Sequence, residues 1–265
     1  MYLPDLPKMP DQNYERQIRE VCAVPAIAEV ERAPESPVDL SVFICFTNRS
    51  GSNYLASLLA TTGELATGRE MFNVKVVSNV CQKHGIASLD AYCRRQMQQQ
   101  AHKRRFVAKV GLAQLLTLAR SGYLGTVFPN PHFIHIQRYD VIAQAVSFMI
   151  AMQNKAFNAR HQPVVSDEDL HYDCDQIARI MSSISTRNRG FQDFLLRNRL
   201  PTLPVFYEQL SDDPLAALSR IMAWLGLAMP QDLASRNTTQ PQSSTLKDAW
   251  RDRFIAESGN ELRSS

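Results

Sequence analysis

The chain has 265 residues, 45% of them hydrophobic, which suits one large α/β domain with or without a subdomain. Its net charge of +3 is too small to argue for nucleic-acid binding, and no apolar run is long enough to span a bilayer. The polar N-terminus lacks the apolar core of a signal peptide. Five cysteines without metal or redox spacing favour a reduced, cytoplasmic setting and predict no metal site.

The expected elements alternate between strands and helices after an N-terminal extension. Residues 1–38 form this extension, in which a helix over residues 12–33 ends before Pro34 and Pro37, and residues 39–265 form one domain. Residues 38–46 are almost continuously apolar, as is typical of a central parallel strand. Further strands are expected at residues 106–110, 131–137 and 203–207, and helices at residues 53–62, 88–103, 112–119, 140–153, 173–196, 213–225 and 246–255.

This alternation predicts a three-layer α/β fold, with a parallel sheet between helices on both faces. Ligands in such folds bind beyond the carboxyl ends of the strands. The loop after residue 46, Lys109 and the turn at Arg138 all lie at such ends. The polar, glutamine-rich segment 88–103 is expected to be an exposed helix, and residues 229–245 are expected to form a loop.

The turn after the first strand has the composition of an anion-binding loop. It carries one guanidinium, one glycine and three hydroxyls, from Thr47, Arg49, Ser50, Gly51 and Ser52. Free N–H groups at the start of the following helix, the helix dipole and the Arg49 donor fork would all favour a bound anion. An ordinary strand-to-helix turn with a serine cap at Ser50 or Ser52 fits the same residues.

Two common nucleotide-binding motifs are absent from the sequence. No Gly-Lys dipeptide occurs, so the lysine and the magnesium-binding hydroxyl of an ATPase P-loop are missing. No Gly-x-Gly occurs either, which excludes the dinucleotide fingerprint. A loop with arginine and hydroxyls but no magnesium ligand suits an anion that is handled without metal.

A second strand-to-helix junction repeats the same chemistry. The strand at residues 131–137 is followed by Arg138, a helix begins near Asp140, and Ser147 lies further along that helix. Alternatively, Arg138 pairs with Asp140 and Ser147 only packs against a neighbour. Two such junctions in one chain fit a ligand with two separated phosphate groups. His132 and His135 face opposite sides of this strand and make a poor metal pair, and His135 is expected in the core.

Taken in order, these blocks resemble the bacterial sulfotransferases of the trehalose 2-sulfotransferase type, which use 3′-phosphoadenosine-5′-phosphosulfate (PAPS). Arg49-Ser50-Gly51-Ser52 matches the first loop of that family, with Asn53 in place of its usual threonine. The other matching blocks are Gly68-Arg69-Glu70-Met71-Phe72-Asn73, Lys109, Arg138 with Asp140, Gln144-Ala145-Val146-Ser147, and Trp250-Arg251-Asp252-Arg253-Phe254. Met71 replaces an aromatic residue of the family, and Thr239 before Gln240 replaces an arginine.

The resemblance covers about residues 41–257 and implies a P-loop-NTPase-like sulfotransferase fold. It also implies transfer of the sulfuryl group of PAPS to a hydroxyl of a carbohydrate or glycolipid. Donor binding would fall to Arg49, Ser50, Gly51, Ser52, Asn53, Arg138 and Ser147, and catalysis to Glu70, Arg49 and Lys109.

Within this implied site, Arg49 and the backbone of residues 50–53 would bind the 5′-phosphosulfate. Arg138 and Ser147 would hold the 3′-phosphate, and Glu70 would be the general base. Lys109 would either support the bridging oxygen or simply cap the sheet. Related enzymes can pair, so a homodimer is a candidate assembly, and no metal is required.

Two alternatives remain open at this point. A kinase-like phosphotransferase would need magnesium-dependent ATP use, against which the missing Gly-Lys argues. A non-catalytic nucleotide-binding protein on the same fold is compatible with the departures at Asn53, Met71 and Thr239.

Overall fold

The computed structural model of the protein describes residues 13–25, 36–156, 164–230 and 245–264. Within these residues, four parallel strands form one sheet in the order β2-β1-β3-β4. The strands are β1 (Leu40–Phe46), β2 (Arg105–Val110), β3 (Pro131–Gln137) and β4 (Thr202–Phe206). All four were expected from their apolar patterns, and the predicted α/β architecture with a parallel sheet is confirmed.

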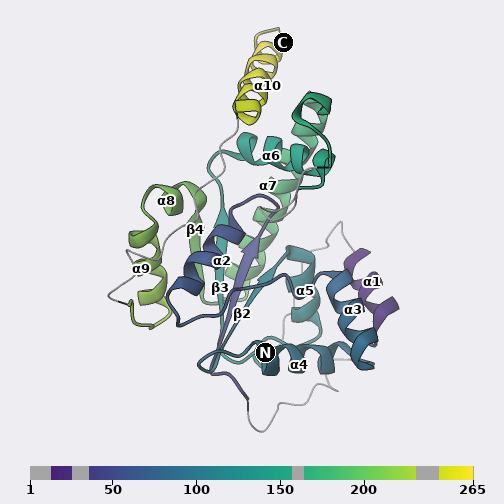
Figure 1. Ribbon diagram of the computed structural model, residues 1–265, viewed down its shortest axis with the longest axis vertical. Coiled ribbons are helices and arrows are strands. Elements are labelled where there is room, and N and C mark those ends of the chain that lie inside the picture. The colour runs from purple at the N-terminus through teal and green to yellow at the C-terminus, as the bar shows by residue number, and fades with distance from the viewer. Residues whose placement is uncertain (1–12, 26–35, 157–163, 231–244, 265) are drawn as a thin grey trace.

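Helices cover both faces of the sheet (Figure 1). Their bounds are α1 (Asn13–Val21), α2 (Ser52–Thr61), α3 (Val74–His84), α4 (Leu89–Gln100), α5 (Leu112–Arg120), α6 (Val141–Asn154), α7 (Cys174–Arg197), α8 (Tyr207–Asp212), α9 (Pro214–Trp224) and α10 (Thr245–Ser264), with a 3₁₀ turn at Asp167–Asp169. In the described residues, no helix is long and apolar enough to cross a membrane.

Strand β1 lies inside the sheet, between β2 and β3, and both of its faces are apolar. Phe43 and Cys45 point into one core and Val42 and Ile44 into another, and all four are fully buried. This alternation follows from the two-residue period of a strand. The first core lies beneath α1, α3, α4 and α5, and the second lies beneath α2 and α9.

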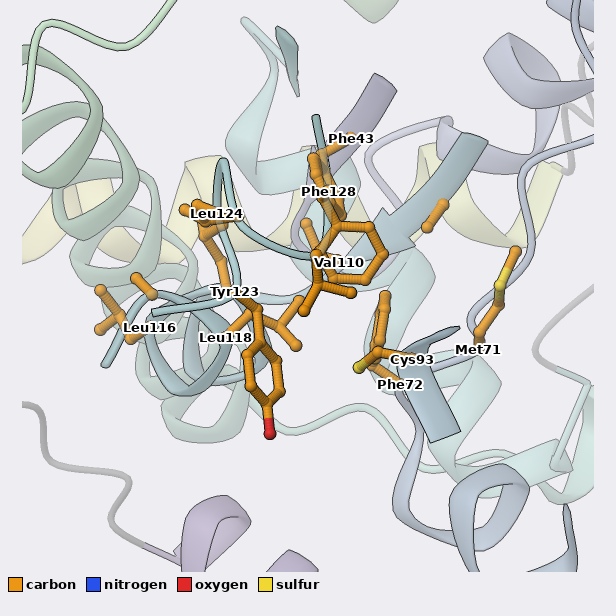
Figure 2. Close-up of a cluster of buried hydrophobic side chains, with 14 of the residues drawn as sticks. Phe43, Met71, Phe72, Cys93, Val110, Leu116, Leu118, Tyr123, Leu124 and Phe128 are labelled. Atoms are coloured by element: carbon orange, nitrogen blue, oxygen red, sulfur yellow. The ribbon is translucent and has the colours of Figure 1, made fainter. Parts of the chain in front are cut away.

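The first core is built on aromatic rings (Figure 2). Phe43 contacts Phe128 edge-on, with ring centroids 5.3 Å apart, and stacks on Phe133 at 5.5 Å. Phe72 meets Phe128 edge-on at 6.0 Å, so the loop after α2 is anchored in this core. Such contacts add to the burial energy of each ring and fix its position.

Helix α1 packs against the domain, although it lies in the segment expected as an extension. Ile18 is fully buried in the first core, and the Tyr14 hydroxyl donates to the Phe72 carbonyl at 2.6 Å. The division of the chain at residue 38 stays a prediction. The structure nevertheless shows that residues 13–25 contribute to the core.

Three sequence expectations need correction. Helix α3 was missed, and so was the short helix α8 that directly follows β4. Helix α4 was expected to be exposed, but its Tyr92, Cys93 and Met97 are buried in the first core. Its glutamine-rich composition concealed an apolar face with helical spacing.

Helices α6, α7 and α10 form a third core beyond the carboxyl ends of the strands (Figure 1). The long helix α7 joins two cores: Ile177 and Ile184 belong to the third, and Phe191 and Phe194 to the first. The carboxyl edge of the sheet is thereby walled by α6 and α10, and the expected ligand site lies at this edge.

Candidate active site

The predicted anion-binding loop joins β1 to α2 in a left-handed turn. Arg49 has φ 63° and Gly51 has φ 91°, and the Ser50 N–H donates to the Thr47 carbonyl at 3.2 Å. Gly51 is the N-cap of α2 and no side chain caps this helix end. The alternative of a serine cap at Ser50 or Ser52 is therefore wrong. The uncapped N-terminus leaves backbone donors and the positive helix end for a ligand.

Position 51 requires glycine because of a close neighbour as well as because of its backbone conformation. A Cβ at this position would lie 2.3 Å from Cδ2 of Tyr207, the first residue of α8. The Arg138 guanidinium lies 4.5 Å from the centroid of the same tyrosine ring, a cation–π contact. The Tyr207 ring therefore contacts both the first loop and Arg138, although its sequence context did not single it out.

The two predicted arginine junctions converge. Arg49 Nε donates to Ser147 Oγ at 3.0 Å, which joins the first loop to α6. Burial lowers the pKa of Arg49, and the positive charge of nearby Arg138 lowers it further. Two guanidinium groups that repel each other at one place favour a bound anion. The Ser147 hydroxyl, assigned from sequence beside Arg138, contacts Arg49 in the structure.

Gln144 on α6 makes a second link between the two sequence blocks. This side chain is fully buried, and its amide donates to Thr47 Oγ1 at 2.9 Å and to the Asn48 carbonyl at 2.8 Å. Because Gln144 and Ser147 lie three residues apart on one face of α6, both reach the same loop. This explains why the two blocks occur together.

Arg138 does not pair with Asp140, so that alternative is also wrong. Arg138 instead forms an ion pair with Glu208, with Nε 3.5 Å from Oε1, although this buried nitrogen makes no hydrogen bond among the described residues. Asp140 instead caps α6 by accepting from the Ala143 N–H at 2.8 Å, and it pairs with Arg251 of α10 at 2.6 Å. The Arg138 guanidinium, whose side chain is partly exposed, is suited to a phosphate oxygen.

A second cluster, formed by Asn53, Glu70 and Lys109, lies at the β2 side of the loop. Lys109 is 4% exposed, and its ammonium group donates to Glu70 Oε1 at 2.9 Å and to Asn53 Oδ1. The Glu70 side chain is 42% exposed and thus reachable by a substrate. The structure places Lys109 in contact with the candidate base.

The loop that carries Glu70 is held on both sides. Its Arg69 carbonyl accepts from the Lys109 backbone N–H at 2.9 Å. The Tyr92 hydroxyl donates to the Met71 carbonyl, and Phe72 is fully buried. A partly exposed carboxylate on a fixed loop is suited to act on a positioned hydroxyl.

The order of the strands arranges these groups in a row along one edge. Lys109 lies near the end of β2, the Arg49 loop follows β1, Arg138 follows β3 and Tyr207 follows β4. Arg49 and Arg138 thus lie in the middle of this row, with the Glu70–Lys109 pair on one side. Thr239 and Gln240, which the sequence comparison also singled out, lie outside the described residues.

One further cation lies near these clusters. Lys247 on α10, which was not singled out from sequence, is half-buried. Burial lowers its pKa, and the charges of Arg49 and Arg138 lower it further.

His135 is a core residue, as expected: it is 2% exposed, and its ring centroid lies 5.0 Å from that of Phe191.

Comparison with known proteins relates the chain to sulfotransferases. The sequence model of the Stf0 sulphotransferase family matches residues 75–257. The trehalose 2-sulfotransferase of Mycolicibacterium smegmatis is 28% identical over 127 residues, which cover 47% of this chain and 46% of that protein. The trehalose 2-sulfotransferase of Mycobacterium tuberculosis is 26% identical over 128 residues, covering 48% and 47%. The chain spans about half the length of the curated relatives that it matches.

Solved structures share the fold at low sequence identity. The sulfotransferase domain from the Synechococcus PCC 7002 olefin synthase has a TM-score of 0.54 and 18% identity, covering 86% of this chain and 91% of that one. The sulfotransferase domain from the curacin biosynthetic pathway has a TM-score of 0.51 and 14% identity, covering 86% and 99%. These similarities establish the fold of the chain.

Proposed function

The chain belongs to the Stf0 sulphotransferase family, and we propose that it transfers the sulfuryl group of PAPS to a hydroxyl of a carbohydrate or glycolipid. The observation that carries this proposal is the convergence of Arg49, Arg138 and Ser147 on one edge of the sheet, beside the Glu70–Lys109 pair. A sugar acceptor is favoured because both curated relatives are named trehalose 2-sulfotransferases.

The donor-binding residues suit a nucleotide with two separated phosphate groups. Arg49 and the N–H groups at the start of α2 would bind the 5′-phosphosulfate, since that helix end has no side-chain cap. Arg138 would hold the 3′-phosphate through its guanidinium, since its side chain is partly exposed. Ser147 would contribute its hydroxyl to the same phosphate. When bound, PAPS would supply the sulfuryl group and leave as adenosine 3′,5′-bisphosphate.

The Glu70–Lys109 pair would do the chemistry on the acceptor side. The Glu70 carboxylate would take the proton of the acceptor hydroxyl as its oxygen bonds to sulfur. Lys109 would stabilise the negative charge that develops on the leaving phosphate oxygen, and its contacts with Glu70 and Asn53 would keep it in place. Each role uses a group that the structure holds in a defined position.

Binding and transfer can be tested separately. Isothermal titration calorimetry with adenosine 3′,5′-bisphosphate, ATP, ADP and NAD should show tight binding of the bisphosphate alone. Arg49→Ala and Arg138→Ala should abolish that binding, whereas Arg16→Ala, which removes an exposed arginine of α1, should leave it unchanged. Wild-type-like affinity in both site variants would refute the proposal, and magnesium-dependent ATP consumption would favour a phosphotransferase.

Transfer is measured with 35S-labelled PAPS and trehalose, other sugars and glycolipids as acceptors. Glu70→Gln should retain bisphosphate affinity and lose transfer, because the amide cannot accept the proton. Full turnover in this variant would remove Glu70 as the base. Intact donor binding by the wild type, without transfer to any hydroxyl, would instead indicate a nucleotide-binding protein on this fold.

A further inference from the structure

The C-terminal helix α10 is fixed beside the Arg138 turn. Arg251 pairs with Asp140 at 2.6 Å, and Asp140 lies two residues after Arg138 and caps α6. On the same helix, Trp250 and Phe254 are 8% and 6% exposed and belong to the third core with α6 and α7. Helix α10 is therefore anchored next to the donor site by an ion pair and by apolar packing.

Lys247 lies one helical turn before Arg251, on the same face of α10. This face meets the start of α6, because Arg251 pairs there with Asp140, two residues after Arg138. It is half-buried, and no ion pair joins it to a carboxylate in the part of the chain that the structure describes. Both arginines act on it electrostatically, and the opposing charges of Asp167 and Asp248 act more weakly.

From this placement we propose that Lys247 is a third phosphate-binding cation of the donor site and that α10 is part of that site. Three positive groups gathered at one place repel one another, and a polyanion relieves this repulsion. Arg251 is then a positioning residue, because its bond to Asp140 holds the turn that carries Lys247. This inference rests on the proposed function, since it takes the nucleotide donor as the anion.

The direct test measures adenosine 3′,5′-bisphosphate affinity by calorimetry for the wild type, Lys247→Ala and Lys247→Arg. The alanine variant should bind about tenfold more weakly, as expected for the loss of one charge-assisted contact, and the arginine variant should recover most of the affinity. Lys83→Ala, which removes an exposed lysine at the end of α3, serves as the charge control and should bind normally.

Thermal unfolding without nucleotide separates a ligand contact from a structural role. Lys247→Ala should melt at the same temperature as the wild type or higher, because the substitution removes a repelling charge. A lower melting temperature with unchanged affinity would overturn the inference. Equal bisphosphate affinity of the wild type and Lys247→Ala would also overturn the inference, while leaving the proposed function intact. Absence of wild-type binding would refute the proposed function itself.

A double-mutant cycle tests the positioning role of Arg251. Arg251→Ala should weaken bisphosphate binding in the wild-type background and have little further effect in Lys247→Ala, because both changes remove the same contact. Additive losses would show that Arg251 does not act through Lys247 and would overturn this part of the inference.

Discussion

Lys109 Nζ lies 2.9 Å from Glu70 Oε1, so a nearly buried cation at the end of β2 holds a partly exposed carboxylate on the adjoining loop. The same ammonium group also contacts Asn53, in the first turn of α2. This contact joins the candidate base to the start of α2, next to the proposed phosphate-binding loop.

Replacement of Lys109 by methionine keeps much of the side-chain volume and removes the charge. We expect kcat to fall by about 10²–10³, the usual effect of losing one donor that stabilises transition-state charge, while bisphosphate affinity changes less. Lys103→Met is the matched control, because it removes an exposed lysine that pairs with Glu64 at 2.6 Å. A Lys109→Met enzyme with unchanged kcat would show that this lysine only caps the sheet.

Gly51→Ala should disrupt the proposed phosphate-binding loop. The left-handed backbone of Gly51 costs about 1–2 kcal/mol for a residue with a Cβ, and that Cβ would lie 2.3 Å from the Tyr207 ring. Chemical denaturation should show a loss greater than the backbone term, and calorimetry should show loss of bisphosphate binding.

Gly85→Ala provides the comparison for Gly51→Ala. Gly85 ends α3 with φ 62° and has nothing within 4 Å of an added Cβ, so this variant should lose only the backbone term and should bind the bisphosphate normally. Equal destabilisation of the two variants would mean that Tyr207 moves aside without penalty.

His135 should make the stability of the fold depend on pH. Burial lowers the pKa of this histidine from 6.5 to about 4, and neighbouring Asn188 opposes the shift only in part. Between pH 6.5 and 4 the unfolded chain binds a proton that the folded protein excludes. The free energy of unfolding should therefore fall as the pH is lowered, by up to about 3 kcal/mol.

Denaturation of the wild type and of His135→Leu at several pH values isolates this contribution. The variant should show a flatter profile above pH 5, because the carboxylates with lowered pKa, such as Asp39 and Glu64, lose their stabilising charge only at lower pH. Identical profiles for the two proteins would contradict the assignment to His135.

Asp140 has two roles that different substitutions separate. Asp140→Ala removes both the cap of α6 and the pair with Arg251, and should cost about 1–2 kcal/mol of stability. Asp140→Asn keeps a side-chain oxygen for the Ala143 N–H and should lose less than half as much. Equal losses in urea denaturation would show that the ion pair, rather than the cap, carries the effect.

Much of the architecture was readable from local patterns. The continuous apolar run of β1 and the helical spacing in α2 and α7 gave elements close to those observed, because burial on both faces or on one face leaves a periodic signal. Helix α8 has only six residues, too few to show that period. Helix α4 was expected to be exposed because its many glutamines make the segment polar on average, although its apolar residues are spaced three and four apart.

The residues that could bind the donor were identifiable as arginines and hydroxyls at strand-to-helix junctions, since the chemistry of an anion site is local. Their convergence depended on β1 lying between β2 and β3, which brings segments 50 to 100 positions apart to one edge. Tyr207 and Lys247 escaped notice for the same reason. Tyr207 lies against the Gly51 loop through long-range packing, and its local sequence shows only a strand end. Lys247 lies within electrostatic reach of both arginines, and its local sequence shows only an amphipathic helix.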